Sequence, residues 1–111
     1  MLVSRDYWIA KGTSGAPAAQ NIDHAEPSDQ NPYLRYLYVD SSDGLRTAFT
    51  LERPAGTVVL AAFTPFYADF GPEGFFVPGN DGDTVRLAVA AGAGTAVTRA
   101  YMVGVDKPRS H

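Results

Sequence analysis

The sequence predicts an all-β fold, an antiparallel β-sandwich of about seven strands. Short stretches of alternating apolar and polar residues recur along the chain, bounded by Gly, Pro, Asn and Asp. They follow one another at roughly the 8 to 12 residue spacing of antiparallel sandwiches, and helical periodicity is absent. Because the stretches 13–32 and 65–78 look like passages between sheets, a sandwich with jelly-roll or immunoglobulin-like connections is favoured over a closed barrel.

Seven stretches account for the predicted strands. The first runs from Val3 through Ile9 and stops at Gly12. The others are 33–39, 45–52, 57–64, 74–77, 84–90 and 97–105. In 45–52 the alternation is cleanest and predicts that Phe49 is a core residue. The nearly all-apolar stretch 57–64 is expected to be a central strand, and Asn80-Asp81-Gly82-Asp83 is expected to be a tight turn.

Residues 13–32 are expected to form a long irregular arm or loop. Gly15, Pro17, Pro27 and Pro32 interrupt this stretch among small and polar residues. A connection of this length is uncommon in a small domain and is usually functional or disordered. Because the arm has little apolar surface of its own, we expect contacts with a neighbouring chain to order it.

Length and composition limit the classes of function. A chain of 111 residues and 11.9 kDa is expected to form one domain, residues 1–111. It has no cysteine, which excludes disulfides and thiolate metal sites. The N-terminal sequence lacks the apolar stretch of a signal peptide, so we expect synthesis in the cytoplasm and no membrane partner. Nine Lys and Arg against twelve Asp and Glu, without a basic cluster, predict no nucleic-acid partner.

Catalytic apparatus is not evident in the sequence. The histidines are His24, in the arm, and His111, the last residue, and there is no G-x-S-x-G motif beside which either would act as a base. Paired carboxylates of the glycosidase type are defined by their separation in space, which the sequence does not reveal. The prediction is therefore a protein that is not an enzyme and has no cofactor.

Two short polar segments contain residue types that bind metal ions. Asp23, His24 and Glu26 offer suitable ligand types, but a structural site generally needs a further ligand from elsewhere in the chain, and a polar loop is the favoured interpretation. The segment 80–83 resembles an acidic calcium loop, yet no glutamate stands at the terminal position of that pattern. No metal site is predicted.

The aromatic residues carry the strongest functional signal. Six tyrosines, six phenylalanines and one tryptophan occur in a small chain, and an exposed cluster of them indicates a protein interface. Strict alternation implies that Tyr33, Tyr36 and Tyr38 do not all share one face of a strand. The predicted interface residues are Ile22, Tyr33, Tyr36, Tyr38, Phe66, Tyr67, Phe70, Phe75 and Phe76. The competing interpretations are an ordinary core with surface tyrosines, and a carbohydrate-binding module in which Trp8 and exposed tyrosines stack on sugars.

The C-terminal third carries a resemblance to a known class of proteins. Residues 75–87, FFVPGNDGDTVRL, followed by 92–97 and 101–105, look like the C-terminal hairpins of small β-sandwich proteins of tailed bacteriophage particles, such as capsid decoration proteins. The resemblance implies a non-catalytic protein, made in the host cytoplasm and located in the virion. It also implies that the protein binds the shell and copies of itself, with a trimer among the expected forms.

Overall fold

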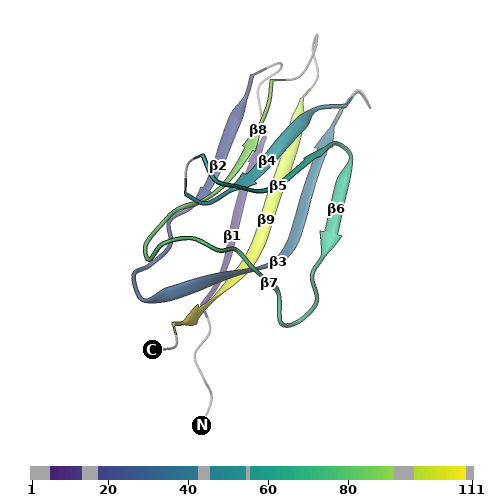
Figure 1. The fold of residues 1–111 in the computed structure, drawn as a ribbon. Helices are drawn as coiled ribbons and strands as arrows, with labels where there is room; N and C mark the ends of the chain where they lie inside the picture. Colours follow the sequence, from purple (N-terminus) through teal and green to yellow (C-terminus); the bar gives the residue numbers. More distant parts are fainter. Residues whose placement is uncertain (1–5, 14–17, 43–45, 55, 92–96, 110–111) are drawn as a thin grey trace.

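A computed structural model describes residues 6–13, 18–42, 46–54, 56–91 and 97–109. These residues form nine strands in two antiparallel sheets, which confirms the predicted all-β sandwich (Figure 1). The strands are β1 (Asp6–Thr13), β2 (Gln20–His24), β3 (Gln30–Ser41), β4 (Ala48–Glu52), β5 (Val58–Phe63), β6 (Phe66–Asp69), β7 (Phe75–Phe76), β8 (Val85–Val89) and β9 (Thr98–Pro108). In this described part of the chain, no helix has the length and apolar character needed to cross a membrane.

The strands pair as in one long hairpin that is rolled up. β1 pairs with β9, β2 with β8, β3 with β6 and β7, and β4 with β5. Successive pairs belong alternately to the first and the second sheet. The strand order is β1-β9-β3-β6 in the first sheet, with β7 also beside β3, and β2-β8-β4-β5 in the second. A hairpin rolled in this way is a jelly roll, so the structure selects that arrangement over the immunoglobulin-like one.

All seven predicted strands are present, and two further strands were not predicted. One of them, β2, lies inside the stretch 13–32 that was expected to be irregular. Its single apolar residue, Ile22, is 5% exposed and points into the core, while β8 supplies the backbone partners. This part of the predicted arm is therefore held by its own chain, and one inward isoleucine among polar residues gave too little alternation to reveal it. Residues 14–17 of the arm lie outside the described residues.

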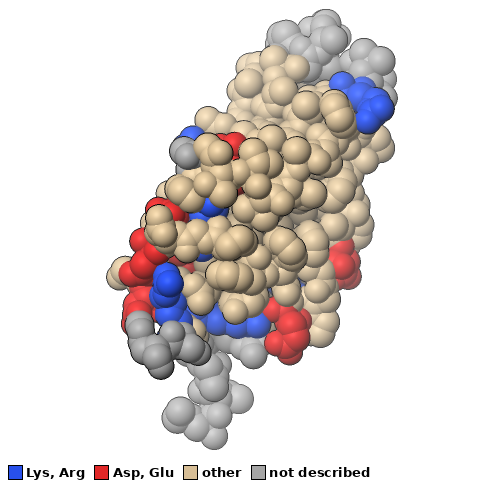
Figure 2. Space-filling view, in the orientation of Figure 1, with Lys and Arg blue, Asp and Glu red and all other residues tan. Residues whose placement is uncertain are grey.

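The expectation that 57–64 is a central strand is wrong. β5 is the last strand of the second sheet, and Val58 and Phe63 are 55% and 50% exposed. An all-apolar run does not distinguish a strand covered on both sides from an edge strand with an apolar surface. Figure 2, in the orientation of Figure 1, shows charged side chains mainly in the lower part of the view and few over β4 and β5.

The core lies between the sheets and contains the inward half of each alternating pattern. Phe49 is 2% exposed, which confirms its predicted place, and its ring meets that of Phe66 edge to face at 5.3 Å. Buried aliphatic side chains from both sheets complete the core: Leu34, Leu37, Val39, Leu51, Val77, Val85, Leu87, Val89 and Met102. Phe66 and Phe70, two of the predicted interface residues, pack against this cluster and are half-buried.

The predicted turn at Asn80-Asp81-Gly82-Asp83 is confirmed. The amide of Asp83 donates to the carbonyl of Asn80 at 3.1 Å, and Gly82 has a φ of 81°, which favours glycine. The turn precedes β8 and follows β7, so it connects the two sheets and does not form a hairpin within one sheet. The sequence also predicts turns at 40–44 and 92–94, and residues 43–45 and 92–96 lie outside the described residues.

Candidate functional site

All six tyrosines of the chain lie on the outer face of the first sheet. The strand register places them there, because residues paired across strands share a face. Tyr7 and Tyr33 both pair with Val105 of β9, and Tyr36 pairs with Val103. One row then crosses the sheet from Lys11 through Tyr101 and Tyr38 to Tyr67. We call this surface, formed by Tyr7, Tyr33, Tyr36, Tyr38, Tyr67 and Tyr101, the tyrosine face.

A β-bulge brings Tyr33 onto the same side as Tyr36 and Tyr38. The register between β3 and β9 shifts between Leu34 and Tyr36, so Arg35 is an extra residue in β3. The extra residue reverses the alternation of side chains beyond the bulge. Tyr33, before the bulge, and Tyr36 and Tyr38, after it, therefore all point outward. The expectation that the three tyrosines cannot share a face is corrected by this bulge, which the residue pattern did not reveal.

The tyrosine face also carries exposed apolar and charged side chains. Tyr7, Ile9 and Tyr67 are 65%, 69% and 59% exposed. The cations beside these rings are Lys11 on β1, Arg99 and Lys107 on β9, and Arg35 on β3. Nζ of Lys107 lies 4.1 Å from the centroid of the Tyr33 ring, and the guanidinium of Arg35 lies 5.6 Å from that of Tyr36. The anions Asp40 and Asp69 lie on β3 and β6. The face is thus aromatic, with cations on three of its strands and anions on the β3 and β6 side.

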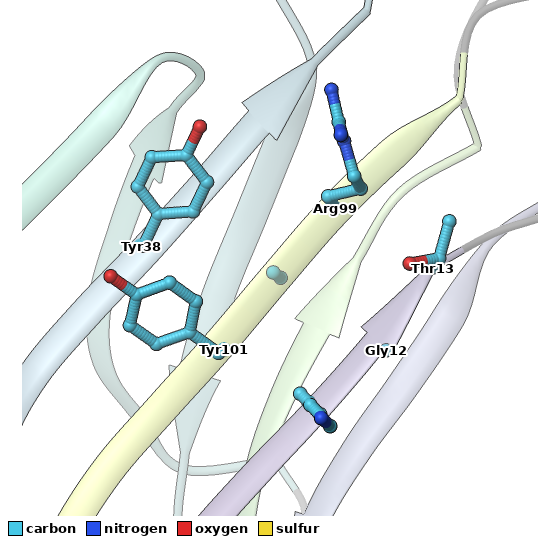
Figure 3. Close-up of a pocket in the computed structure, with 7 residues that line it drawn as sticks. Gly12, Thr13, Tyr38, Arg99 and Tyr101 are labelled. Atoms are coloured by element: carbon cyan, nitrogen blue, oxygen red, sulfur yellow. The ribbon is translucent and has the colours of Figure 1, made fainter.

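A groove lies on the tyrosine face where β1 ends and β9 begins, and Figure 3 shows the residues that line it. Its volume is about 620 Å³, and its lining includes Tyr38, Tyr101, Arg99 and Lys11. The two tyrosine rings are nearly parallel, with centroids 5.2 Å apart and an angle of 16° between their planes. The hydroxyl of Tyr38 donates to Oδ2 of Asp40 at 3.0 Å, and this hydrogen bond raises the pKa of Tyr38 above its usual value. The groove therefore has an uncharged aromatic floor with cations beside it.

The remaining predicted interface residues are dispersed. Phe75 and Phe76 of β7 are 41% and 42% exposed, and Phe76 packs against Tyr33 at 5.5 Å between ring centroids. Phe76 extends the tyrosine face at one corner, whereas Phe75 pairs with the inward-pointing Leu34 and lies against Phe70 at 5.4 Å between ring centroids. Ile22 is buried in the core, which differs from the interface role predicted for it, because its side chain points between the sheets.

Trp8, the predicted sugar-stacking residue, is engaged inside the sandwich. Its ring stacks on the imidazole of His24 at 3.9 Å with an angle of 7°, and its Nε1 donates to Oδ1 of Asp106 at 3.1 Å. His24 therefore occupies one face of the indole. This placement differs from the open platform that a sugar would need.

Around Trp8, three ionisable side chains meet at one end of the sandwich. Nε2 of His24 lies 3.1 Å from Oε2 of Glu26 and 3.1 Å from Oδ2 of Asp106. Burial, together with hydrogen bonding and repulsion from Glu26, raises the pKa of Asp106 from its ordinary value of 3.8 to about 6. Asp23, which the sequence grouped with His24 and Glu26, points outward instead and pairs with Arg86 at 2.9 Å.

The sequence could not have revealed Asp106 as a member of this group. It follows His24 by 82 positions and comes from the other sheet. The alternation in β2 separates Asp23 from His24, because neighbouring side chains in a strand point to opposite faces. The sequence shows an imidazole and a carboxylate close together at His24 and Glu26. The third member, Asp106, is brought to them only by the fold.

Comparisons with protein-family models, curated proteins and solved structures gave no match.

Proposed function

We propose that this chain is a non-catalytic structural protein that assembles with copies of itself through the tyrosine face. The observation that carries the proposal is the gathering of all six tyrosines on one face of one sheet. A core needs no such distribution, because none of these side chains lies between the sheets. Tyrosine supplies a large apolar area with little side-chain entropy to lose, and it is enriched in protein interfaces.

The exposure of the face supports a binding role. Tyr7, Ile9 and Tyr67 each leave more than half of their surface in solvent. Monomeric proteins seldom expose contiguous apolar area of this kind, because it loses free energy in water. A partner that covers the face would recover this free energy.

A second copy of the chain fits the charge pattern of the face. If two faces meet around a two-fold axis parallel to the strands, β9 of one copy lies opposite β3 of the other. Arg99 then faces the other copy's Asp40, and Lys11 lies within reach of its Asp69, because each pair occupies equal or neighbouring rows. Such a self-complementary face is what a two-fold interface requires.

We place this assembly in a virion, as a decoration or stabilising protein of the capsid made in the host cytoplasm. The resemblance of 75–87, 92–97 and 101–105 to phage particle proteins supports this context. Jelly rolls are common in viral capsid domains, although the fold is compatible with many functions. The shell would be a second protein partner beside the copies of the chain.

Sedimentation velocity over a wide range of protein concentration tests self-association. We expect the chain to form dimers or higher symmetric oligomers, and Tyr67→Ser to raise the dissociation constant at least about ten-fold. Phe63→Ser is the matched control, since Phe63 is comparably exposed but lies on the outer face of the second sheet. A chain that stays monomeric at all concentrations, or equal effects of the two variants, would contradict the proposal.

The groove over Tyr38 and Tyr101 favours one alternative, a carbohydrate-binding module. Two nearly parallel rings beside cationic groups suit an acidic sugar. On a glycan array, this function predicts binding that Tyr101→Ala abolishes and that persists in Trp8→Ala, because Trp8 lies outside the groove. Binding of this kind by a strictly monomeric chain would replace the first proposal with the second.

A further inference from the structure

The cluster of His24, Glu26 and Asp106 joins three separate segments of the chain. His24 is the last residue of β2, Glu26 lies in the connection to β3, and Asp106 belongs to β9 of the other sheet. One ligand atom from each of the three lies within 4.8 Å of the others. Glu26 and Asp106 are 6% and 2% exposed, while 15% of the His24 side chain is reachable by solvent.

Apart from His24 and Asp106, the carboxylate of Glu26 has no polar partner among the described residues. Both of its oxygens are buried and unsatisfied, and its side chain is 0% exposed. Nε2 of His24 is near, but it carries at most one hydrogen and already lies 3.1 Å from Oδ2 of Asp106. A buried carboxylate without a donor is costly, so a cation or a proton must accompany it.

The nearest buried cation is occupied elsewhere. Arg53 is 0% exposed, and its guanidinium donates to the backbone carbonyls of Val77, Asp83 and Asn80 at 2.8, 2.9 and 3.0 Å. Its charge acts on the carboxylate of Glu26 by long-range electrostatics. Oε2 of Glu26 lies 3.1 Å from Nε2 of His24 instead.

The spacing of the ligand atoms suits a small divalent ion. A metal about 2.1 Å from each of two ligands, at angles between octahedral and tetrahedral, separates the ligand atoms by roughly 3.0 to 3.4 Å. The separations of 3.1 Å from Nε2 to each carboxylate fall in this interval. Trp8 supports two of the ligands, because it stacks on His24 and donates to Asp106.

We propose that His24, Glu26 and Asp106 bind one divalent transition-metal ion, with Zn²⁺ as the best match, through Nε2 and one oxygen of each carboxylate. An imidazole with two carboxylates suits Zn²⁺ better than Ca²⁺, which takes six to eight oxygen ligands, or Mg²⁺, which prefers oxygen ligands alone. Three protein ligands leave a position for water on the exposed side of His24. The ion fastens β2 and its following connection to β9, across the two sheets.

Isothermal titration of the metal-free protein with ZnCl₂ tests the site. We expect one ion per chain with a dissociation constant in the micromolar range or below. Glu26→Gln, which preserves volume, and His24→Ala should each weaken binding at least about ten-fold. Asp23→Asn is the matched control, because Asp23 adjoins His24 but points outward to Arg86, and it should bind as the parent does.

Trp8 provides a second readout because it is the chain's single tryptophan and stacks on a proposed ligand. Co²⁺, which is paramagnetic, should quench its fluorescence in the parent and in Asp23→Asn, and not in Glu26→Gln that circular dichroism shows to be folded. Absence of saturable Zn²⁺ binding overturns the proposal and leaves a proton shared by Glu26 and Asp106. Equal binding by Glu26→Gln and Asp23→Asn, or binding of Ca²⁺ or Mg²⁺ in preference to Zn²⁺, also overturns it.

Discussion

The outer faces of the two sheets differ although one jelly roll builds both. The tyrosine face carries six large amphipathic rings together with charged side chains of both signs, among them Lys11, Arg99, Asp40 and Asp69. The outer face of the second sheet carries small side chains in its middle, and its shallow groove of about 310 Å³ is lined by Ala48, Thr50 and Ala88. The Arg86–Asp23 ion pair borders this face, so its charges there are already partnered within the chain.

The comparison shows where the function of such a fold is encoded. The inward side chains of each strand form the core, which requires apolar residues of suitable volume. The outward side chains are not under that packing requirement. A face with six tyrosines fits the proposed contact, whereas the opposite face has alanine and threonine in its middle and exposes Val58 and Phe63 only on the edge strand β5.

A substitution in the core, which lies beneath both faces, should have the largest effect on stability. Phe49→Ala should lower the free energy of unfolding by about 3 to 5 kcal/mol, because it leaves a cavity where a 2% exposed ring packs on Phe66. Its neighbour Thr50 points outward on the second sheet, and Thr50→Ala should cost less than about 1 kcal/mol. Urea unfolding measures both. A loss under about 1 kcal/mol for Phe49→Ala would contradict the assignment of the inward face.

A smaller effect is expected where β9 passes beneath the tyrosine face. A Cβ at Gly104 would fall on the indole of Trp8, so Gly104→Ala should displace that ring from His24 and cost roughly 1 to 3 kcal/mol. Thermal unfolding and the emission wavelength of Trp8 report the change. An unaltered melting temperature together with unaltered emission would show that Trp8 is not tightly held.

The smallest effect concerns the pH dependence of one carboxyl on the inner side of β9. In the metal-free protein, burial and the neighbouring Glu26 raise the pKa of Asp106 to about 6, while His24 opposes the shift. The carboxyl of Asp106 then keeps its proton in the native state up to about pH 6, whereas the unfolded state releases it near pH 4. Its contribution to the free energy of unfolding is therefore complete below pH 4 and is lost as the pH rises through about 6. Unfolding free energies measured from pH 4 to 7 should show a smaller decline in Asp106→Asn, and an equal decline in both proteins would contradict the shift.

The sequence predicted the architecture because alternation and turn residues are local signals. Phe49 and seven strands could be placed from them, and the turn at Asn80-Asp81-Gly82-Asp83 follows from the glycine that its φ favours. β2 was missed because Ile22 is its only inward apolar residue. The edge position of β5 was missed because an apolar run does not state what covers it.

The sites depended on information that the sequence does not hold locally. The sharing of one face by six tyrosines requires the register of four strands and the bulge at Arg35. The cluster at His24 requires Asp106, which only the pairing of the sheets brings near. In both cases the residue types were visible and their convergence was not.

Mixing two charge variants tests the central claim, the two-fold contact of tyrosine faces, most directly. Asp40 and Arg99 are paired across β3 and β9. Arg99→Asp makes both of these positions anionic, and Asp40→Arg makes both cationic. Because like charges would then face each other across the contact, each variant alone should associate at least about ten-fold more weakly than the parent. An equimolar mixture pairs the anionic row of one chain with the cationic row of the other, and sedimentation velocity should then show a heterodimer about as stable as the parent dimer. A mixture that stays monomeric where the parent dimerises would contradict the claim.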